Sequence, residues 1–190
     1  MPDHFRVPWA FDGDGVVIAG DDGMAGLRFT QAGMQVVSGQ AAETVRWGEA
    51  LRLQVKVPYS SLASYYLLEA FNLLSPGHGY HSAKVIEVQA MLKRRDASWQ
   101  LGRPARFSWR LQLVLDDLFD VISERKRFEA LADHALWEWV GTELVGTVPF
   151  WARALMYTDL VCLQRHLGGH GAYRKRIAAY LDAQVPPCPA

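Results

Sequence analysis

The 190-residue chain predicts an α+β protein in which a strongly bent antiparallel sheet of about seven strands forms a partly open barrel. A helix closes this sheet, and extra C-terminal helices follow. Between Val16 and Leu115, short segments alternate apolar and polar residues and are separated by turns that contain Gly and Asp. Such alternation is typical of half-buried strands. After these segments, apolar residues recur every three or four positions, which is the period of an amphipathic helix.

Seven segments carry the strand pattern, and a short extended piece at 43–47 precedes the fourth. In chain order the seven are residues 16–19, 27–30, 34–38, 51–57, 84–93, 99–101 and 107–115. The 51–57 segment has apolar side chains at every odd position, as in a strand with one face in water. A tight hairpin turn at 31–33 is expected between the second and third segments, with Gly33 suited to a positive φ.

Helical patterns follow or interrupt the strands. A helix over 128–140 closes the sheet, after a short helical turn at 118–122 and a break near 123–127. Residues 61–74 and 148–167 predict helices that are apolar nearly all round, and 173–184 predict a last amphipathic helix. Trp137 and Trp139 point to different faces of the 128–140 helix. At least one of them therefore packs under the C-terminal helices or forms an exposed patch for a partner.

We therefore expect residues 1–141 to form the sheet domain, with a helical insertion near 60–75, and residues 142–190 to form a helical extension packed on it. A helix without a polar face is buried or lies in an interface. If the sheet cannot cover the two apolar helices, a second copy of the chain must, which predicts a homodimer. The interface residues of that dimer would include Leu67, Phe71, Trp151 and Leu155.

Two short motifs, together with the strand count followed by a helix, resemble the pleckstrin-homology-like (PH-like) domains of bacteria. Residues 27–36, LRFTQAGMQV, resemble the second and third strands with their hairpin glycine. Residues 44–50, TVRWGEA, resemble the turn in which Trp precedes a polar–acidic pair. The resemblance covers residues 16–140 and implies a bent sheet closed by a helix. The segment 59–82 would be a large insertion in that family, and the helices after 141 lie outside its pattern.

Charge and composition exclude several classes of function. The 20 basic and 20 acidic residues give a net charge of zero, so neither nucleic acid nor an anionic membrane is an expected partner. Phosphoinositide-binding PH domains gather basic residues at the loop joining their first two strands. Here that loop carries Asp21 and Asp22, which would repel a phosphorylated headgroup.

The cellular location and the charge pattern also follow from the sequence. The first residues lack the pattern of a signal peptide, the apolar 148–167 stretch contains three charged residues, and only two cysteines occur. A cytoplasmic protein without a transmembrane segment is expected. Residues 84–110 carry seven basic and two acidic side chains, and residues 111–145 carry eight acidic and three basic ones. The two stretches form solvated faces of opposite sign or contact each other.

Few residues point to a specific chemistry. Asp116 and Asp120, with Asp117 between them, have the spacing of an aspartate-rich Mg²⁺ motif, but a position at the start of a helix favours capping. His134 lies beside the apolar stripe of its helix, where a partly buried, hydrogen-bonded histidine is expected. Arg94 and Arg95 could form an anion site but more simply form a solvated turn. No cofactor or metal site is expected.

Two classes of function fit these observations. The first is a non-catalytic module for protein–protein association or self-association. The alternative is a small-molecule-binding protein or enzyme with a pocket between the sheet and the C-terminal helices, lined by Trp and Tyr. Asp116, Asp120 and His134 would be the first polar groups to test in such a pocket.

Overall fold

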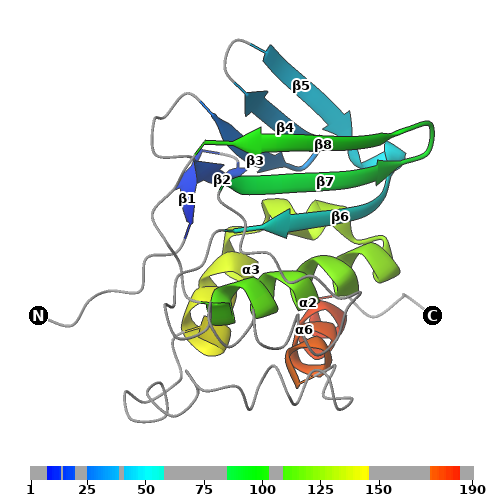
Figure 1. The fold of residues 1–190 in the computed structure, drawn as a ribbon. Coiled ribbons are helices and arrows are strands. Elements are labelled where there is room, and N and C mark those ends of the chain that lie inside the picture. Colours follow the sequence, from blue (N-terminus) through cyan, green and yellow to red (C-terminus); the bar gives the residue numbers. More distant parts are fainter. Residues whose placement is uncertain are drawn as a thin grey trace, which may run out of the picture.

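The computed structural model of this chain describes residues 8–13, 15–19, 25–38, 41–57, 85–102, 109–145 and 172–184. These residues form two antiparallel sheets, of five and three strands, with a layer of helices beneath them (Figure 1). The predicted α+β class is therefore confirmed. The strands divide into two separate sheets that do not close into a barrel.

The first sheet is a meander with the strand order β1-β2-β3-β4-β5. Its strands are β1 (Trp9–Asp12), β2 (Gly15–Ala19), β3 (Gly26–Thr30), β4 (Gly33–Ser38) and β5 (Ala41–Arg46). One face of the sheet supplies alternate buried side chains to the core: Val16, Ile18, Leu27, Phe29, Met34, Val36 and Val45. The prediction did not include β1, because only Trp9 of its four residues is buried and no alternation marks it.

Gly33 closes the predicted β3–β4 hairpin, but not for the predicted reason. Among the described residues a positive φ occurs at Gly13, Gly102 and Lys126, and not at Gly33. A Cβ atom at Gly33 would lie 2.3 Å from the carbonyl oxygen of Val45 on β5. The close approach of β5 therefore excludes a side chain at this position.

The second sheet has the order β6-β7-β8 and confirms the strands predicted at 51–57, 84–93 and 99–101. Its strands are β6 (Ala50–Lys56), β7 (Ile86–Leu92) and β8 (Asp96–Leu101), and the 3-10 helix η1 (Trp47–Glu49) links β5 to β6. β4 of the first sheet contacts β8 of the second. Between the sheets, Glu43 accepts a hydrogen bond from Trp99 Nε1 (3.0 Å) and forms an ion pair with Arg95.

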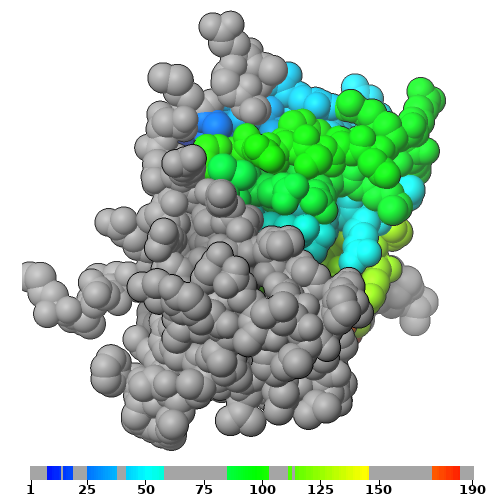
Figure 2. All heavy atoms as spheres, viewed as in Figure 1, coloured from blue at the N-terminus to red at the C-terminus, as the bar shows by residue number. Residues whose placement is uncertain are grey.

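The outer face of the second sheet is polar. Register places the outward side chains together: Arg52, Gln54, Lys56, Glu87, Gln89, Met91, Asp96, Ser98 and Gln100. Met91 is the apolar member of this group and is 49% exposed. Figure 2 shows β7 and β8 (green) at the molecular surface in this view. The alternation that predicted these strands thus reflects burial on one face.

Helix α2 (Trp109–Arg125) lies beneath β6 (Figure 1) and overturns the strand predicted at 107–115. Its buried side chains follow a helical period: Leu111, Val114, Leu115, Leu118, Phe119, Val121 and Ile122. The alternation within 107–115 is part of this longer stripe, and a short window shows only the local alternation. The predicted break near 123–127 is confirmed, since α2 ends at Arg125 and Lys126 has a φ of 54°.

The helix predicted over 128–140 is divided into three pieces. They are the 3-10 helix η2 (Phe128–Ala132), α3 (His134–Trp139) and the π-helical turn η3 (Val140–Val145). Asp133 separates η2 from α3 with an extended backbone and caps α3 by accepting a hydrogen bond from the Ala135 N–H. The last predicted helix is confirmed as α6 (Ala172–Ala183), which packs on α2.

Trp137 lies at the centre of the core between the sheets and the helices. Its side chain is fully buried, stacks on Phe29 of β3 with centroids 5.8 Å apart, and contacts Trp9 and Phe119. Its indole N–H donates a hydrogen bond to the Leu131 carbonyl oxygen at 2.8 Å. Trp139 faces the other way and stacks on Tyr180 of α6. Both tryptophans therefore pack within the fold.

Candidate functional site

Side chains of α2 bind the outer edge of β6, which is the edge strand of the second sheet. The Val57 N–H donates a hydrogen bond to Gln112 Oε1 at 2.6 Å, and Gln112 Nε2 donates to the Val55 carbonyl oxygen at 3.3 Å. Gln112 therefore binds β6 as the peptide group of a neighbouring strand would. Nε2 also lies 2.7 Å from Asp116 Oδ1 on the next turn of α2.

The last turn of α2 and the residue after it, Lys126, continue this contact. The Leu53 N–H donates a hydrogen bond to the buried Ser123 Oγ at 3.1 Å, and Lys126 Nζ donates to the Leu51 carbonyl oxygen at 2.6 Å. Unpaired N–H and C=O groups on an edge strand are a template for pairing with another chain. The helix thus covers an edge that would otherwise be open.

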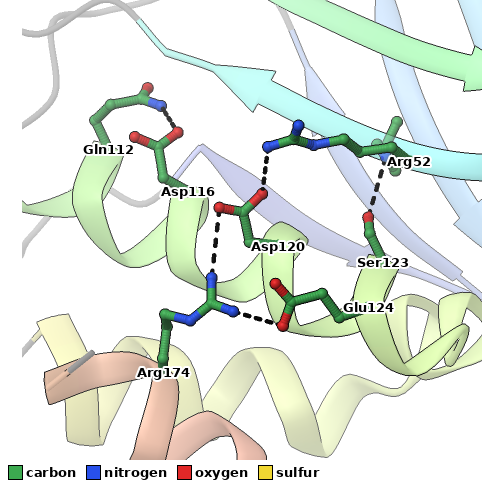
Figure 3. A network of polar contacts seen from close by, with 8 residues as sticks. Arg52, Gln112, Asp116, Asp120, Ser123, Glu124 and Arg174 are labelled. Atoms are coloured by element: carbon green, nitrogen blue, oxygen red, sulfur yellow. Dashed lines mark hydrogen bonds and ion pairs between the residues drawn. The ribbon is translucent and has the colours of Figure 1, made fainter. Parts of the chain in front are cut away.

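Asp120 lies between two arginines from distant parts of the chain (Figure 3). Its carboxylate is 2.9 Å from Arg52 of β6 and 3.6 Å from Arg174 of α6, and Arg174 also pairs with Glu124. The hydrogen bond with Glu124 raises the pKa of Arg174, although burial opposes this shift. This network ties α6 and β6 to α2. Asp120 and Glu124 of α2 thus pair with arginines outside the basic stretch 84–110.

The aspartates of α2 do not cap that helix. Asp116, Asp117 and Asp120 lie in its interior, because the helix begins at Trp109. The predicted capping role depends on a helix that begins after a strand at 107–115, and α2 already begins at Trp109. Among the described residues, no group of three or more His, Cys, Asp and Glu side chains could hold a metal ion.

His134 lies at the first sheet, as a partly buried and hydrogen-bonded side chain. Its Nε2 is 3.1 Å from the Gly15 carbonyl oxygen, and its ring packs at a tilt against Phe11 with centroids 4.6 Å apart. A carbonyl oxygen can only accept, so Nε2 carries the proton in this contact. The partners of His134 belong to β1 and β2, whereas those of Asp120 belong to β6 and α6.

Several predicted features lie outside the described residues. They include the proposed interface residues Leu67, Phe71, Trp151 and Leu155, the acidic loop with Asp21 and Asp22, and the two apolar helices. Arg94 lies exposed in the turn between β7 and β8, and Arg95 pairs with Glu43. Within the described ranges, no helix is both long enough and apolar enough to cross a membrane.

A pocket of about 200 Å³ lies between the β3–β4 turn, η2, α3 and the end of α6. Its polar lining includes Arg127, Glu129, Asp133, Tyr180 and Gln184. It occupies the junction of the sheet and the C-terminal helix, and neither Asp116, Asp120 nor His134 lines it. Residues from four separate elements thus converge on one concave site.

The apolar part of the pocket is preformed by the core. Leu136 and Leu181 are 1% and 2% exposed, and Ala130 also lines the pocket. Tyr180 is held by its stacking on Trp139, with ring centroids 4.4 Å apart and planes at 20°. A wall fixed in this way loses little conformational freedom when a ligand binds.

The electrostatics of the pocket centre on Asp133. Burial and the charge of Asp133 both raise the pKa of the Tyr180 hydroxyl, while a hydrogen bond with Gln184 opposes the shift. The Asp133 carboxylate is therefore close enough for its charge to influence the Tyr180 hydroxyl. Tyr180 stays protonated at neutral pH and offers both a donor and an acceptor.

Pocket residues were not among those singled out from the sequence. Tyr180 and Gln184 belong to the predicted last helix, where the sequence indicates only that they are part of an amphipathic pattern. Asp133 precedes His134, and its position at a helix start is a capping signal. Neither a protein-family model, nor a curated protein, nor a solved structure matches this chain.

Proposed function

We propose that this chain is a non-catalytic binding module, and that its ligand occupies the pocket between the β3–β4 turn, η2, α3 and α6. The observation that carries the proposal is the convergence of charged and polar groups over an apolar floor. Ligand sites combine apolar contacts that bind a ligand with polar groups that orient it, and this pocket offers both.

The contacts of the other titratable residues support a binding role over a catalytic one. A general acid and base must reach the same reacting group within hydrogen-bond distance. Asp120 is held by Arg52 and Arg174, and His134 is held against Gly15. Asp120 and His134 therefore lie in separate contacts and do not face a common reacting group. This separation favours structural roles for both.

The resemblance to bacterial PH-like domains also supports a binding role. The two motifs that carry it correspond to the β3–β4 hairpin and to the turn from β5 through η1 into β6. In this proposal the sheet is a rigid scaffold, and the β3–β4 turn adds Gln31 to the pocket. A phosphoinositide is disfavoured as the ligand, because the acidic Asp21–Asp22 sequence would repel its phosphates.

A fragment screen mapped by NMR tests this function. The labelled full-length chain is titrated with small cationic, anionic and neutral fragments, and amide shifts are followed. We expect a subset of fragments to shift the amides around Ala130, Asp133 and Tyr180. Shifts confined to other parts of the chain, or none with any fragment, would reject the pocket as the binding site.

A pair of matched variants controls the screen. Ala130→Leu adds three carbon atoms to the pocket lining, whereas Ala135→Leu makes the same change at an exposed position of α3 that does not line the pocket. Ala130→Leu should abolish fragment binding, and Ala135→Leu should leave it unchanged. Circular dichroism and thermal unfolding establish that both variants are folded. Equal binding by both folded variants would contradict the proposal.

A further inference from the structure

The pocket has an excess of negative charge. Arg127 Nε lies 2.9 Å from Glu129 Oε1, so this pair is neutral as a unit. The Asp133 carboxylate receives a neutral backbone N–H, from Ala135 at 2.9 Å. The three charged side chains of the lining therefore sum to one negative charge, and that charge belongs to Asp133.

The apolar floor sets the second requirement on a ligand. Leu136, Leu181 and Tyr180 all line the pocket. Aliphatic side chains favour a short hydrocarbon stem, and a tyrosine hydroxyl can accept a hydrogen bond from a cationic head group. The volume of about 200 Å³ admits a small head and stem.

We infer that this pocket binds an alkylammonium group, with its ammonium at Asp133 and Tyr180 and its hydrocarbon stem on Leu136 and Leu181. The inference rests on the proposed binding function and names the chemistry of the ligand. A free small amine and a lysine side chain of a partner protein both carry this group. The pocket distinguishes the ammonium from an alcohol or a carboxylate of the same size through the charge of Asp133.

Three probes of equal length test the inference by NMR titration of the full-length chain at neutral pH. They are n-butylammonium, n-butanol and butyrate, which differ in the charge of the head group. We expect butylammonium to shift the amides of the pocket residues at about millimolar concentration, as is usual for so small a ligand. Butanol should bind more weakly, and butyrate should not bind.

A variant that changes only the charge isolates the role of Asp133. Asparagine caps a helix as well as aspartate does, so Asp133→Asn keeps the start of α3 and removes the negative charge. We expect this variant to bind butylammonium about tenfold more weakly, which is the usual cost of a lost charge-assisted hydrogen bond. Glu138→Gln, an exposed change on the same helix outside the pocket, should leave the affinity unchanged.

Two peptides separate the possible sources of the ammonium. Gly-Lys-Gly with blocked ends is compared with the same peptide carrying N-acetyl-lysine. Binding of the lysine peptide and loss on acetylation would assign the site to a protein partner, whereas binding of butylammonium alone would assign it to a free amine. Either result supports the inference.

Equal affinity for butylammonium, butanol and butyrate would overturn the inference, and so would an Asp133→Asn variant that binds butylammonium as the unchanged protein does. In both cases the pocket would still bind ligands, so the proposed function would stand. Absence of binding by every probe and every screening fragment would reject both.

Discussion

Replacing Gln112 with methionine tests the contact between α2 and the edge of β6. Methionine has a similar length and volume but neither donates nor accepts a strong hydrogen bond. The Val57 N–H, on a residue that is 1% exposed, would lose its 2.6 Å partner, and the Val55 carbonyl oxygen would lose its 3.3 Å partner. A buried donor left unpaired costs about 1–3 kcal/mol, and the weaker bond adds about 0.5–1 kcal/mol. The free energy of unfolding should therefore fall by about 1.5–4 kcal/mol.

Urea denaturation followed by circular dichroism measures this loss. The matched control is Gln89→Met on the outer face of β7, where the amide donates to Glu87 at 3.0 Å. This surface change should alter the free energy of unfolding by less than about 0.5 kcal/mol. Gln112→Met should also form dimers or larger species in sedimentation as its concentration rises, because part of the β6 edge is uncovered. Equal stability losses in the two variants would refute the role of Gln112.

Three further predictions follow from single contacts. Gly33→Ala should lower the free energy of unfolding by about 1–3 kcal/mol, because its Cβ would lie 2.3 Å from the Val45 carbonyl oxygen, and an unchanged thermal midpoint would contradict this. Arg174→Gln should cost about 1 kcal/mol and speed amide exchange in α6, since Glu124 loses its ion pair and Asp120 keeps only Arg52; uniform exchange changes across the chain would argue against it. The raised pKa of Tyr180 means that the unfolded chain loses this proton at a lower pH than the folded chain. The contribution of Tyr180 to the free energy of unfolding is therefore complete below a pH of about 10 and is lost above it. Urea titrations of Tyr180→Phe at rising pH should show a smaller decline in the free energy of unfolding. An identical decline in the variant would show that Tyr180 is not its source.

The sequence predicted strands well where one face of a strand is buried and the other is in water. Residues 53–57 show this, because buried and half-buried side chains alternate there as the apolar pattern does. The same alternation was misleading at 107–115, where the apolar residues belong to a helical stripe that continues to Ile122. The π-helical turn and the interruption at Asp133 have no periodic signal, so the helix over 128–140 was expected to be continuous.

The candidate site was harder to predict than the fold, because it depends on contacts between distant residues. Arg52 and Asp120 are 68 positions apart, and no local pattern links them. The partial burial and hydrogen bonding of His134 could be predicted from its place beside an apolar stripe. The sequence could not identify the residues of the pocket. They come from η2, α3, α6 and a hairpin turn, and only the tertiary structure brings these elements together.

The cover that α2 gives to β6 has a consequence for protein synthesis. The residues that complete this edge follow it by 55 to 75 positions, so β6 leaves the ribosome well before Gln112, Ser123 and Lys126 do. During that interval its outward amides and carbonyls are available to any other extended chain nearby. The nascent chain can therefore misassemble through β6 after this strand has emerged and before α2 has emerged. A chaperone that shields β6 would act during this interval.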